Sequence, residues 1–172
     1  GSTYGVYAQR YDAAGAAQGA SFVVNTSTSN TQAPGAVVGY SGGFAVVWYS
    51  NHAGGDGYDI YLKRYDNAGA VVTAETRVST TPGNPADAQN GTQYLPDVTA
   101  YANGNLVIVW HDSNGNDGSG YGVYGRLYNA ASGTFSDTFL VNTTTAGSQS
   151  YPAAGYEPRV AVLANGDFVV VW

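Results

Sequence analysis

The sequence predicts an all-β protein made of antiparallel four-stranded repeats that resemble the blades of a β-propeller. The first observation behind this prediction is a short apolar phrase ending in tryptophan, which recurs every 62 residues at 42–48, 104–110 and 166–172. The second is the composition, with 24 glycines and a charged fraction of 10%, in which Val, Tyr, Thr and Phe favour strands. The third is the turn chemistry between the apolar runs. Such a period predicts repeated structural units.

Each repeat contains four candidate strands. One follows a Gly-rich loop and has the form Tyr-x-x-Tyr, the next ends in Asn-Thr or Ser-Thr, the third starts near a proline or alanine, and the fourth ends in tryptophan. In that order they lie at 4–15, 58–69 and 121–133; at 21–26, 75–80 and 139–143; at 36–40, 96–101 and 158–163; and at 44–48, 106–110 and 168–172.

The strands are of two kinds. The segments that end in Trp110 and Trp172 are apolar at consecutive positions, which is typical of strands covered on both faces. We therefore expect them to be inner strands. The segment that starts at Tyr4 mixes aromatic, small and polar residues and is expected to be an outer strand.

Turn residues predict how the strands connect. Asp12 with Gly15, and Asp66 with Gly69, fit a type I turn that closes with a glycine bulge. Asn-Gly pairs are signals of two-residue hairpin loops. They occur at Asn103-Gly104 and Asn165-Gly166, and Ser41-Gly42-Gly43 stands in the same place in the first repeat.

Four antiparallel strands per unit with no intervening helix favour a propeller blade over a sandwich. We expect one domain over 1–172, with repeat segments at approximately 1–48, 49–110 and 111–172. Aromatic residues that recur at one strand position are expected to fill the space between blades. They are Trp48, Trp110, Trp172, Tyr7, Tyr61 and Tyr124.

The order of the strands predicts self-association. The chain opens on an outer pair and stops on an inner strand at Trp172, and propellers have typically four to eight blades. The strands suffice for only three blades. We therefore expect the chain to be a fragment of a longer protein, a dimer that closes a ring, or an end-to-end polymer.

Charge and composition exclude several classes of protein. A net charge of −6 with only six Lys and Arg argues against nucleic-acid binding. No apolar run approaches the roughly 20 residues of a membrane span. Cysteine is absent, which removes disulfides, thiolate catalysis and zinc-thiolate sites. Methionine is absent too, so we expect a processed product or a fragment.

One loop is a candidate calcium site. Asp112, Asn114, Asn116 and Asp117 place oxygen atoms near a sharp glycine bend, and Asp56 lies in the corresponding loop of the preceding repeat. Calcium prefers such ligands. The loop lacks the glycine and the distal glutamate of the calcium-loop template, so a polar turn between strands is the alternative.

Catalysis has little support in the sequence, and no enzyme is predicted. His52 and His111 follow tryptophan strands in equivalent places, where we expect loop or rim positions, and no Ser-His-Asp arrangement is near them. Glycan binding is the stronger alternative, because fifteen tyrosines and three tryptophans among Gly- and Asn-rich loops could stack on sugar rings.

Four phrases resemble the tandem repeats of very large secreted bacterial proteins of the RTX adhesin or hemolysin-type calcium-binding kind. They lie at 4–15, 117–121, 139–152 and 163–172. The resemblance implies an extracellular, cell-surface array that acts in attachment or matrix building, and it implies no enzyme. Because the chain lacks a Gly-Gly-x-Gly-x-Asp nonapeptide, the calcium roll of that family does not carry over.

The predicted function is therefore a non-enzymatic extracellular β-repeat module that serves as a scaffold or in adhesion. Two alternatives stay open: a carbohydrate-binding propeller, and a fibre subunit in which the strand of Trp172 completes a blade around Tyr4 of the next copy. An unpaired edge of this kind invites the addition of another chain.

Overall fold

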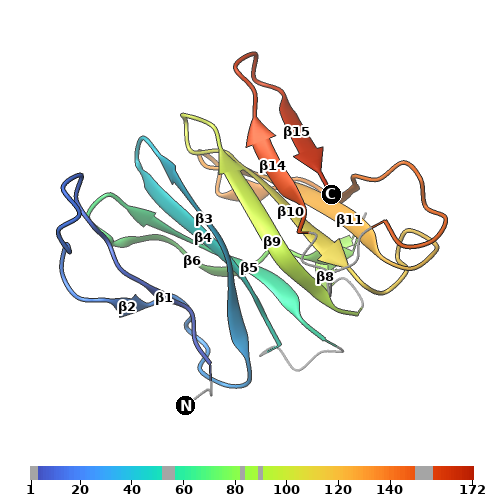
Figure 1. The fold of residues 1–172 in the computed structure, drawn as a ribbon, viewed down its shortest axis with the longest axis horizontal. Helices are drawn as coiled ribbons and strands as arrows, with labels where there is room; N and C mark the ends of the chain where they lie inside the picture. Colours follow the sequence, from blue (N-terminus) through green and yellow to red (C-terminus); the bar gives the residue numbers. More distant parts are fainter. Residues whose placement is uncertain (1–3, 52–56, 82–83, 89–90, 150–156) are drawn as a thin grey trace.

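The structure, a computed structural model, describes residues 4–51, 57–81, 84–88, 91–149 and 157–172 (Figure 1). Over these ranges the chain forms strands and turns and no helix. Among these residues there is therefore no helix long and apolar enough to cross a membrane. The predicted all-β class with antiparallel sheets is confirmed.

Two complete sheets form the centre of the molecule. The first sheet has the strand order β3-β4-β5-β6, and the second sheet has the order β9-β10-β11, with β12 and β13 both paired to the outer side of β11. All pairs are antiparallel. Their bounds are β3 Gln32–Tyr40, β4 Gly43–Ser50, β5 Asp59–Asp66, β6 Val71–Arg77, β9 Gln93–Ala100, β10 Leu106–Asp112, β11 Gly122–Asn129, β12 Thr134–Phe135 and β13 Phe139–Leu140.

A two-stranded sheet packs on each of the two complete sheets. We call β1 and β2 the N-terminal pair, and β14 and β15 the C-terminal pair. A separate short hairpin, β7 with β8, follows the first sheet. The bounds are β1 Tyr7–Ala8, β2 Phe22–Val23, β7 Thr80–Thr81, β8 Asn84–Ala88, β14 Arg159–Val162 and β15 Phe168–Val171.

Each complete sheet joins the hairpin that ends in tryptophan with the hairpin that follows it in sequence. The sheets therefore cross the boundaries of the repeat segments, and the first sheet includes both sides of the boundary at 48 and 49. Among the described residues, the N-terminal pair corresponds to the outer half of a complete sheet and the C-terminal pair to the inner half. The packing layers place the four units in chain order, and Figure 1 shows the N-terminal pair at one side of the first sheet and the C-terminal pair against the second sheet.

Three layers of side chains hold these units together. Trp48 lies in the layer between the N-terminal pair and the first sheet, and Trp110 lies in the layer between the two sheets. Both tryptophans are 0% exposed. The layers contain Val6, Val24, Val46, Trp48, Tyr61 and Tyr65; then Val47, Leu62, Val98, Ile108, Trp110 and Tyr124; then Val107, Val109 and Val160.

The repeated aromatic residues pair across strands. Trp48 lies opposite Tyr61 in the first sheet, with their rings stacked at 5.9 Å between centroids. Trp110 lies opposite Tyr124 at the equivalent place in the second sheet. The 62-residue period therefore describes equivalent positions in the fold as well as in the sequence.

A second repeated feature stabilises the outer strands. At one place in the N-terminal pair and in each of the two complete sheets, a side-chain oxygen accepts the hydrogen bond of a backbone N–H group, so the donor is satisfied although the strand pairing is interrupted. The pairs are Val6 with Asn25 at 2.8 Å, Ile60 with Ser79 at 3.0 Å and Val123 with Asn142 at 2.8 Å.

The turns follow the predictions in part. Gly69 has φ +89° and donates to Asp66 O at 3.0 Å, as expected for a type I turn with a glycine bulge. The two-residue loops predicted at the Asn-Gly pairs are wrong. Tyr101 N donates to Asn105 O at 2.9 Å, which leaves a three-residue loop that ends at Gly104 with φ +84°. The 163–167 turn is built in the same way.

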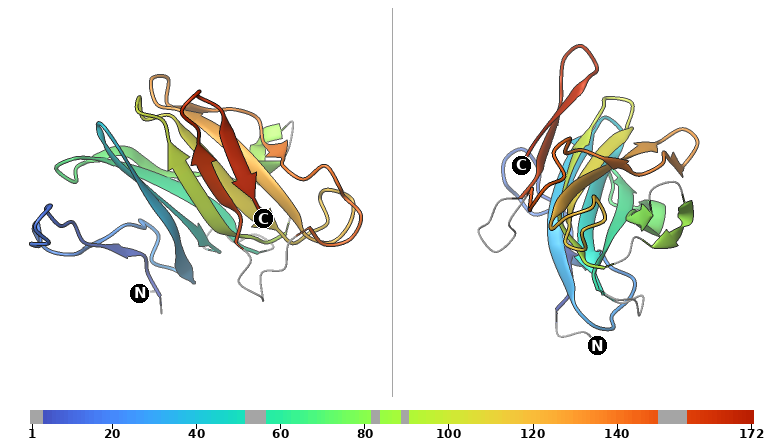
Figure 2. Two further views of the ribbon diagram at one scale, coloured as in Figure 1. Left: turned by 45° about the horizontal axis from the view of Figure 1, so that its top comes forward. Right: turned by 90° about the vertical axis from the view of Figure 1, so that its right-hand side faces the viewer.

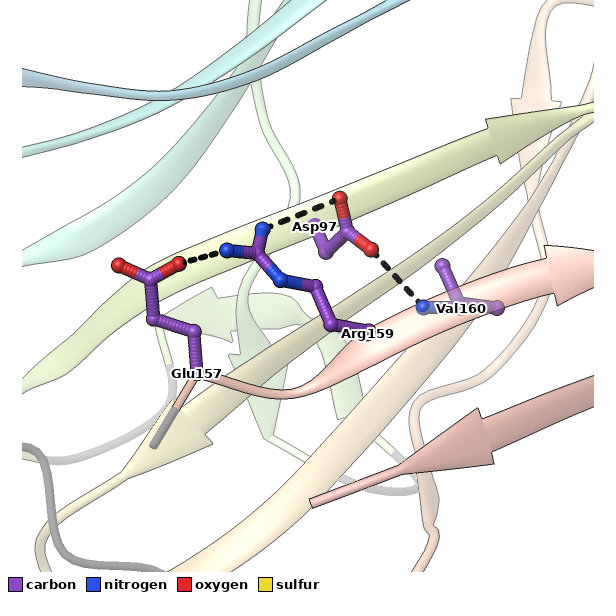
Figure 3. Close-up of polar contacts among 4 residues, drawn as sticks. All are labelled: Asp97, Glu157, Arg159 and Val160. Carbon is purple, nitrogen blue, oxygen red and sulfur yellow. Dashed lines mark hydrogen bonds and ion pairs between the residues drawn. The ribbon is translucent and has the colours of Figure 1, made fainter. Parts of the chain in front are cut away.

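The units approach each other closely at two junctions. A Cβ on Gly35 would lie 2.5 Å from the ring of Pro96, so β3 and β9 meet where only glycine fits. At the next junction Asp97 accepts the N–H of Val160 at 2.8 Å and faces Arg159 at 3.9 Å, while Arg159 also pairs with Glu157 (Figure 3).

Candidate functional site

The loop predicted to bind calcium begins at Asp112, the last residue of β10, whose side chain is fully buried. Its carboxylate accepts hydrogen bonds from Gln93 Nε2 at 2.8 Å and from Asn116 Nδ2 at 2.9 Å. The backbone N–H of Asn114 donates to it at 3.1 Å. Burial raises the pKa of the Asp112 carboxyl, and these hydrogen bonds oppose that rise.

Asp117 fastens the same loop to the outer strands. One carboxylate oxygen accepts the N–H of Ser119 at 3.2 Å, and the other accepts Asn142 Nδ2 at 2.9 Å. Asn142 is also the residue that satisfies the N–H of Val123. Asp56, the remaining candidate ligand, lies outside the described residues.

The structure shows these carboxylates with amide donors, and the calcium site stays a prediction. Calcium needs several oxygen atoms that converge on one point, but amide N–H groups surround the carboxylates of Asp112 and Asp117. Side-chain amides that donate hydrogen bonds to a buried carboxylate are what a polar turn requires. The geometry thus agrees with the alternative stated for this sequence, a polar turn between strands.

The first sheet has a related but smaller polar group at its equivalent end. Ser79 Oγ donates to Asp59 Oδ1 at 3.0 Å and accepts the N–H of Ile60 at 3.0 Å. Ranges 4–51, 57–81, 84–88, 91–149 and 157–172 contain no group of three or more His, Cys, Asp or Glu side chains that could hold a metal ion.

The loop position expected for His111 is wrong. This residue lies within β10, opposite Val123 and Tyr94, and is fully buried. Its ring centroid is 6.3 Å from that of Tyr94. The strand extends further beyond Trp110 than the tryptophan signal suggested, because pairing with β9 and β11 continues to Asp112. His52 lies outside the described residues.

The six repeated aromatic positions divide into two groups. Four are buried, and burial raises the pKa of Tyr61 to about 12 and raises that of Tyr124 as well. The other two, Tyr7 and Trp172, are 69% and 49% exposed. These two belong to or adjoin the terminal pairs, which are two-stranded among the described residues.

A groove at the N-terminal end was not predicted from the sequence. It has a volume of about 370 Å³ and lies between β1 and one face of the first sheet. Apolar side chains dominate its lining. Among the residues that line it are Val6, Ala8, Arg10, Pro34, Val37 and Val46. In sequence these belong to three separate strand segments, and only their packing creates the groove.

A buried arginine lies at the outer edge of the interface between the two sheets. Arg64 is 5% exposed, and its guanidinium carbon is 4.9 Å from the ring centroid of Tyr40 and 5.0 Å from that of Tyr128. Its Nη1 donates to the Tyr128 hydroxyl at 3.3 Å. These cation–π contacts account for the burial of the charge by packing.

Comparison of the chain with known proteins identifies no relative: no family model, no curated protein and no solved structure matches it.

Proposed function

We propose that this chain is a non-enzymatic structural module of an extracellular bacterial surface or matrix protein, in which its β-repeats act as a scaffold for attachment. The observation that carries the proposal is the burial of the repeated aromatic residues. Trp48, Trp110, Tyr61 and Tyr124 are between 0% and 4% exposed. Side chains packed in the interior are not available to a ligand, so the repeat supports architecture rather than binding.

The polar residues support the same proposal. Asp112 and Asp117 have their oxygens engaged by amide donors within the loop. His111 lies in a buried strand rather than facing a cleft. General acid–base chemistry requires a titratable group within hydrogen-bond reach of a substrate, and these side chains are placed for holding strands and turns together.

A carbohydrate-binding role has one observation in its favour. Tyr4, Tyr7 and Tyr11 are 64%, 69% and 63% exposed, and aromatic rings can stack on sugars. However, the equivalents of Tyr7 and Tyr11 in the first sheet, Tyr61 and Tyr65, are buried. The exposure of these tyrosines is therefore particular to the two-stranded N-terminal pair and does not recur at the equivalent positions of the first sheet.

Surface display tests the scaffold proposal. One, two or three copies of the chain are placed between a membrane anchor and a terminal epitope on a bacterial cell. We expect antibody access to the epitope to rise with copy number, and an unrelated β-sandwich of the same size to substitute for the chain without loss.

Glycan arrays test the alternative with the purified chain, and calcium and chelator are compared in the same measurement. The scaffold proposal predicts no saturable signal in either condition. Saturable binding to one glycan class that disappears in the Tyr4→Ser/Tyr11→Ser variant would replace the scaffold with a sugar-binding module.

A further inference from the structure

The C-terminal end of the molecule exposes apolar residues that are buried elsewhere in the fold. Val169 and Val171 on β15 are 45% and 59% exposed. Val107 and Val109, which precede Trp110 as these two precede Trp172, are both 0% exposed because the C-terminal pair covers them. β15 therefore presents a face of the kind that the fold otherwise covers with another unit.

The N-terminal end shows the opposite half of the same pattern. Tyr7 and Tyr11 are 69% and 63% exposed, whereas Tyr61 and Tyr65 are 4% and 2% exposed. In the first sheet Tyr61 lies opposite Trp48, on a tryptophan strand. β1 has the equivalent tyrosines but no tryptophan strand beside it among the described residues, where it pairs with β2 alone.

The groove of about 370 Å³ marks the place where that strand would lie. Val37 faces it and is 67% exposed, while Val98 and Val160, at the equivalent position of β9 and β14, are 6% and 9% exposed. Each of these two valines is covered by the inner strands of the preceding unit. Val37 is open because, among the described residues, only the two strands of the N-terminal pair lie on this side of the first sheet.

The chain cannot fill its own groove in this fold. The N-terminal pair packs on the first sheet and the C-terminal pair packs on the second sheet, with the layer between the two sheets separating them. Figures 1 and 2 show the two pairs on different sides of the molecule. A second copy of the chain supplies a strand with the matching pattern, because β15 and Trp172 repeat the phrase of the tryptophan strands.

We propose that the C-terminal pair of one copy binds the N-terminal pair of a second copy, so that β15 pairs antiparallel with β1 and the two halves form a complete sheet. The register follows from the first sheet, where Trp48 is opposite Tyr61 and Phe44 is opposite Tyr65. It places Trp172 opposite Tyr7 and Phe168 opposite Tyr11. This inference names the partner of the module and rests on the proposed scaffold function.

The same register places Val171 opposite Ala8, as Val47 is opposite Leu62 in the first sheet and Val109 is opposite Gly125 in the second. Val171 then enters the groove and packs on Val37. The contact joins two different surfaces, so it is head-to-tail, and successive copies form a ring or a filament according to the rotation between them.

Disulfide trapping tests the register, because the chain has no native cysteine. Copies that contain A8C are mixed with copies of a different mass that contain V171C and are oxidised mildly. Directly opposed positions in antiparallel strands lie close enough for a disulfide, so we expect the mixed disulfide to form. The control V170C shifts the position by one residue to the other face, and we expect it to form little mixed disulfide.

Light scattering at several concentrations tests the surface itself. We expect a mass above that of the monomer, and we expect V169K/V171K to weaken the association by more than about tenfold. V71K/V72K is the matched control, because Val71 and Val72 on the outer strand β6 are 53% and 57% exposed. This control should leave the association unchanged.

Two results would overturn the proposal: a monomer at all concentrations with no mixed disulfide, or an association that V71K/V72K removes and V169K/V171K does not. Either result would leave the scaffold function standing. Conversely, glycan binding in the arrays would overturn the scaffold function and leave the strand pairing intact, so the two failures are distinguishable.

Discussion

Asp112 illustrates how amide donors satisfy a buried carboxylate in this fold. Amide donors from Gln93 and Asn116 and the N–H of Asn114 satisfy its oxygens. Burial nevertheless raises its pKa above the usual value of 3.8. The charged form is therefore less favoured in the folded state than in the unfolded chain.

This shift predicts how the free energy of unfolding depends on pH. Between pH 3.8 and the raised pKa of Asp112 the folded state binds more protons than the unfolded state, so stability falls as pH rises through that window. Asp112→Asn does not titrate, and the other carboxylates are common to both proteins. We expect the stability of the wild type relative to D112N to decrease as pH rises above 3.8.

Urea unfolding of both proteins across pH 3.5 to 7, about the range in which carboxyls titrate, measures this difference. A pH-independent difference would contradict the prediction. Carbon NMR of the Asp112 carboxyl provides a direct readout of its pKa in the folded protein.

Opposed residues on neighbouring strands have complementary side-chain sizes in the two sheets. Gly125 on β11 lies opposite Phe139 on β13, and a Cβ on Gly125 would lie 2.6 Å from the Phe139 ring. At the equivalent place in the first sheet Leu62 lies opposite Thr76. One large and one small side chain thus share the same space in both sheets, with their positions exchanged.

Exchanging the pair tests this complementarity. We expect Gly125→Leu to lower the free energy of unfolding by about 1–3 kcal/mol, because a well-packed site has no room for it. Phe139→Thr should lower it by roughly 2–4 kcal/mol through the space it leaves.

The double variant G125L/F139T recreates the pair of the first sheet and should be more stable than the sum of the single effects by about 1 kcal/mol or more. Chemical denaturation of the four proteins measures the cycle. Simple additivity would show that the two residues do not share their space.

In the whole molecule, burial depends on position along the stack. Each unit packs mainly on its neighbours, as in repeat proteins, and within the described residues each terminal pair packs on one complete sheet. The same sequence phrase consequently has a tryptophan at 0% exposure in β4 and β10 and one at 49% exposure after β15.

This difference in burial between equivalent tryptophans predicts that the same substitution has unequal effects on stability. Trp48→Ala should lower the free energy of unfolding by about 3–5 kcal/mol, because it leaves a cavity in a closed layer. Trp172→Ala, at the equivalent but half-exposed position, should cost less than about half as much. Urea denaturation followed by circular dichroism at low protein concentration, where the copies are separate, measures both. Equal losses would mean that the terminal pair is as closely packed as the centre.

Local features of the sequence determined the all-β class and the hairpin positions, whereas the Tyr-rich segments expected to be outer strands are central in both complete sheets, as β5 and β11. The class and the hairpins depend on side-chain pattern and turn residues within a few positions, such as Asp66 with Gly69, and such short-range preferences act in the same way wherever the segment packs. The period that ends in Trp48, Trp110 and Trp172 identified equivalent positions before any contact was known.

Tertiary structure alone decided what those positions do. Only packing shows that amides enclose Asp112, that His111 is buried in a strand, and that Val37 faces a groove. Each depends on contacts between residues far apart in sequence, and one residue type has different surroundings in each unit of the stack. Whether a side chain is buried depends on the residues that pack against it, and the order of the sheets in space determines which residues these are.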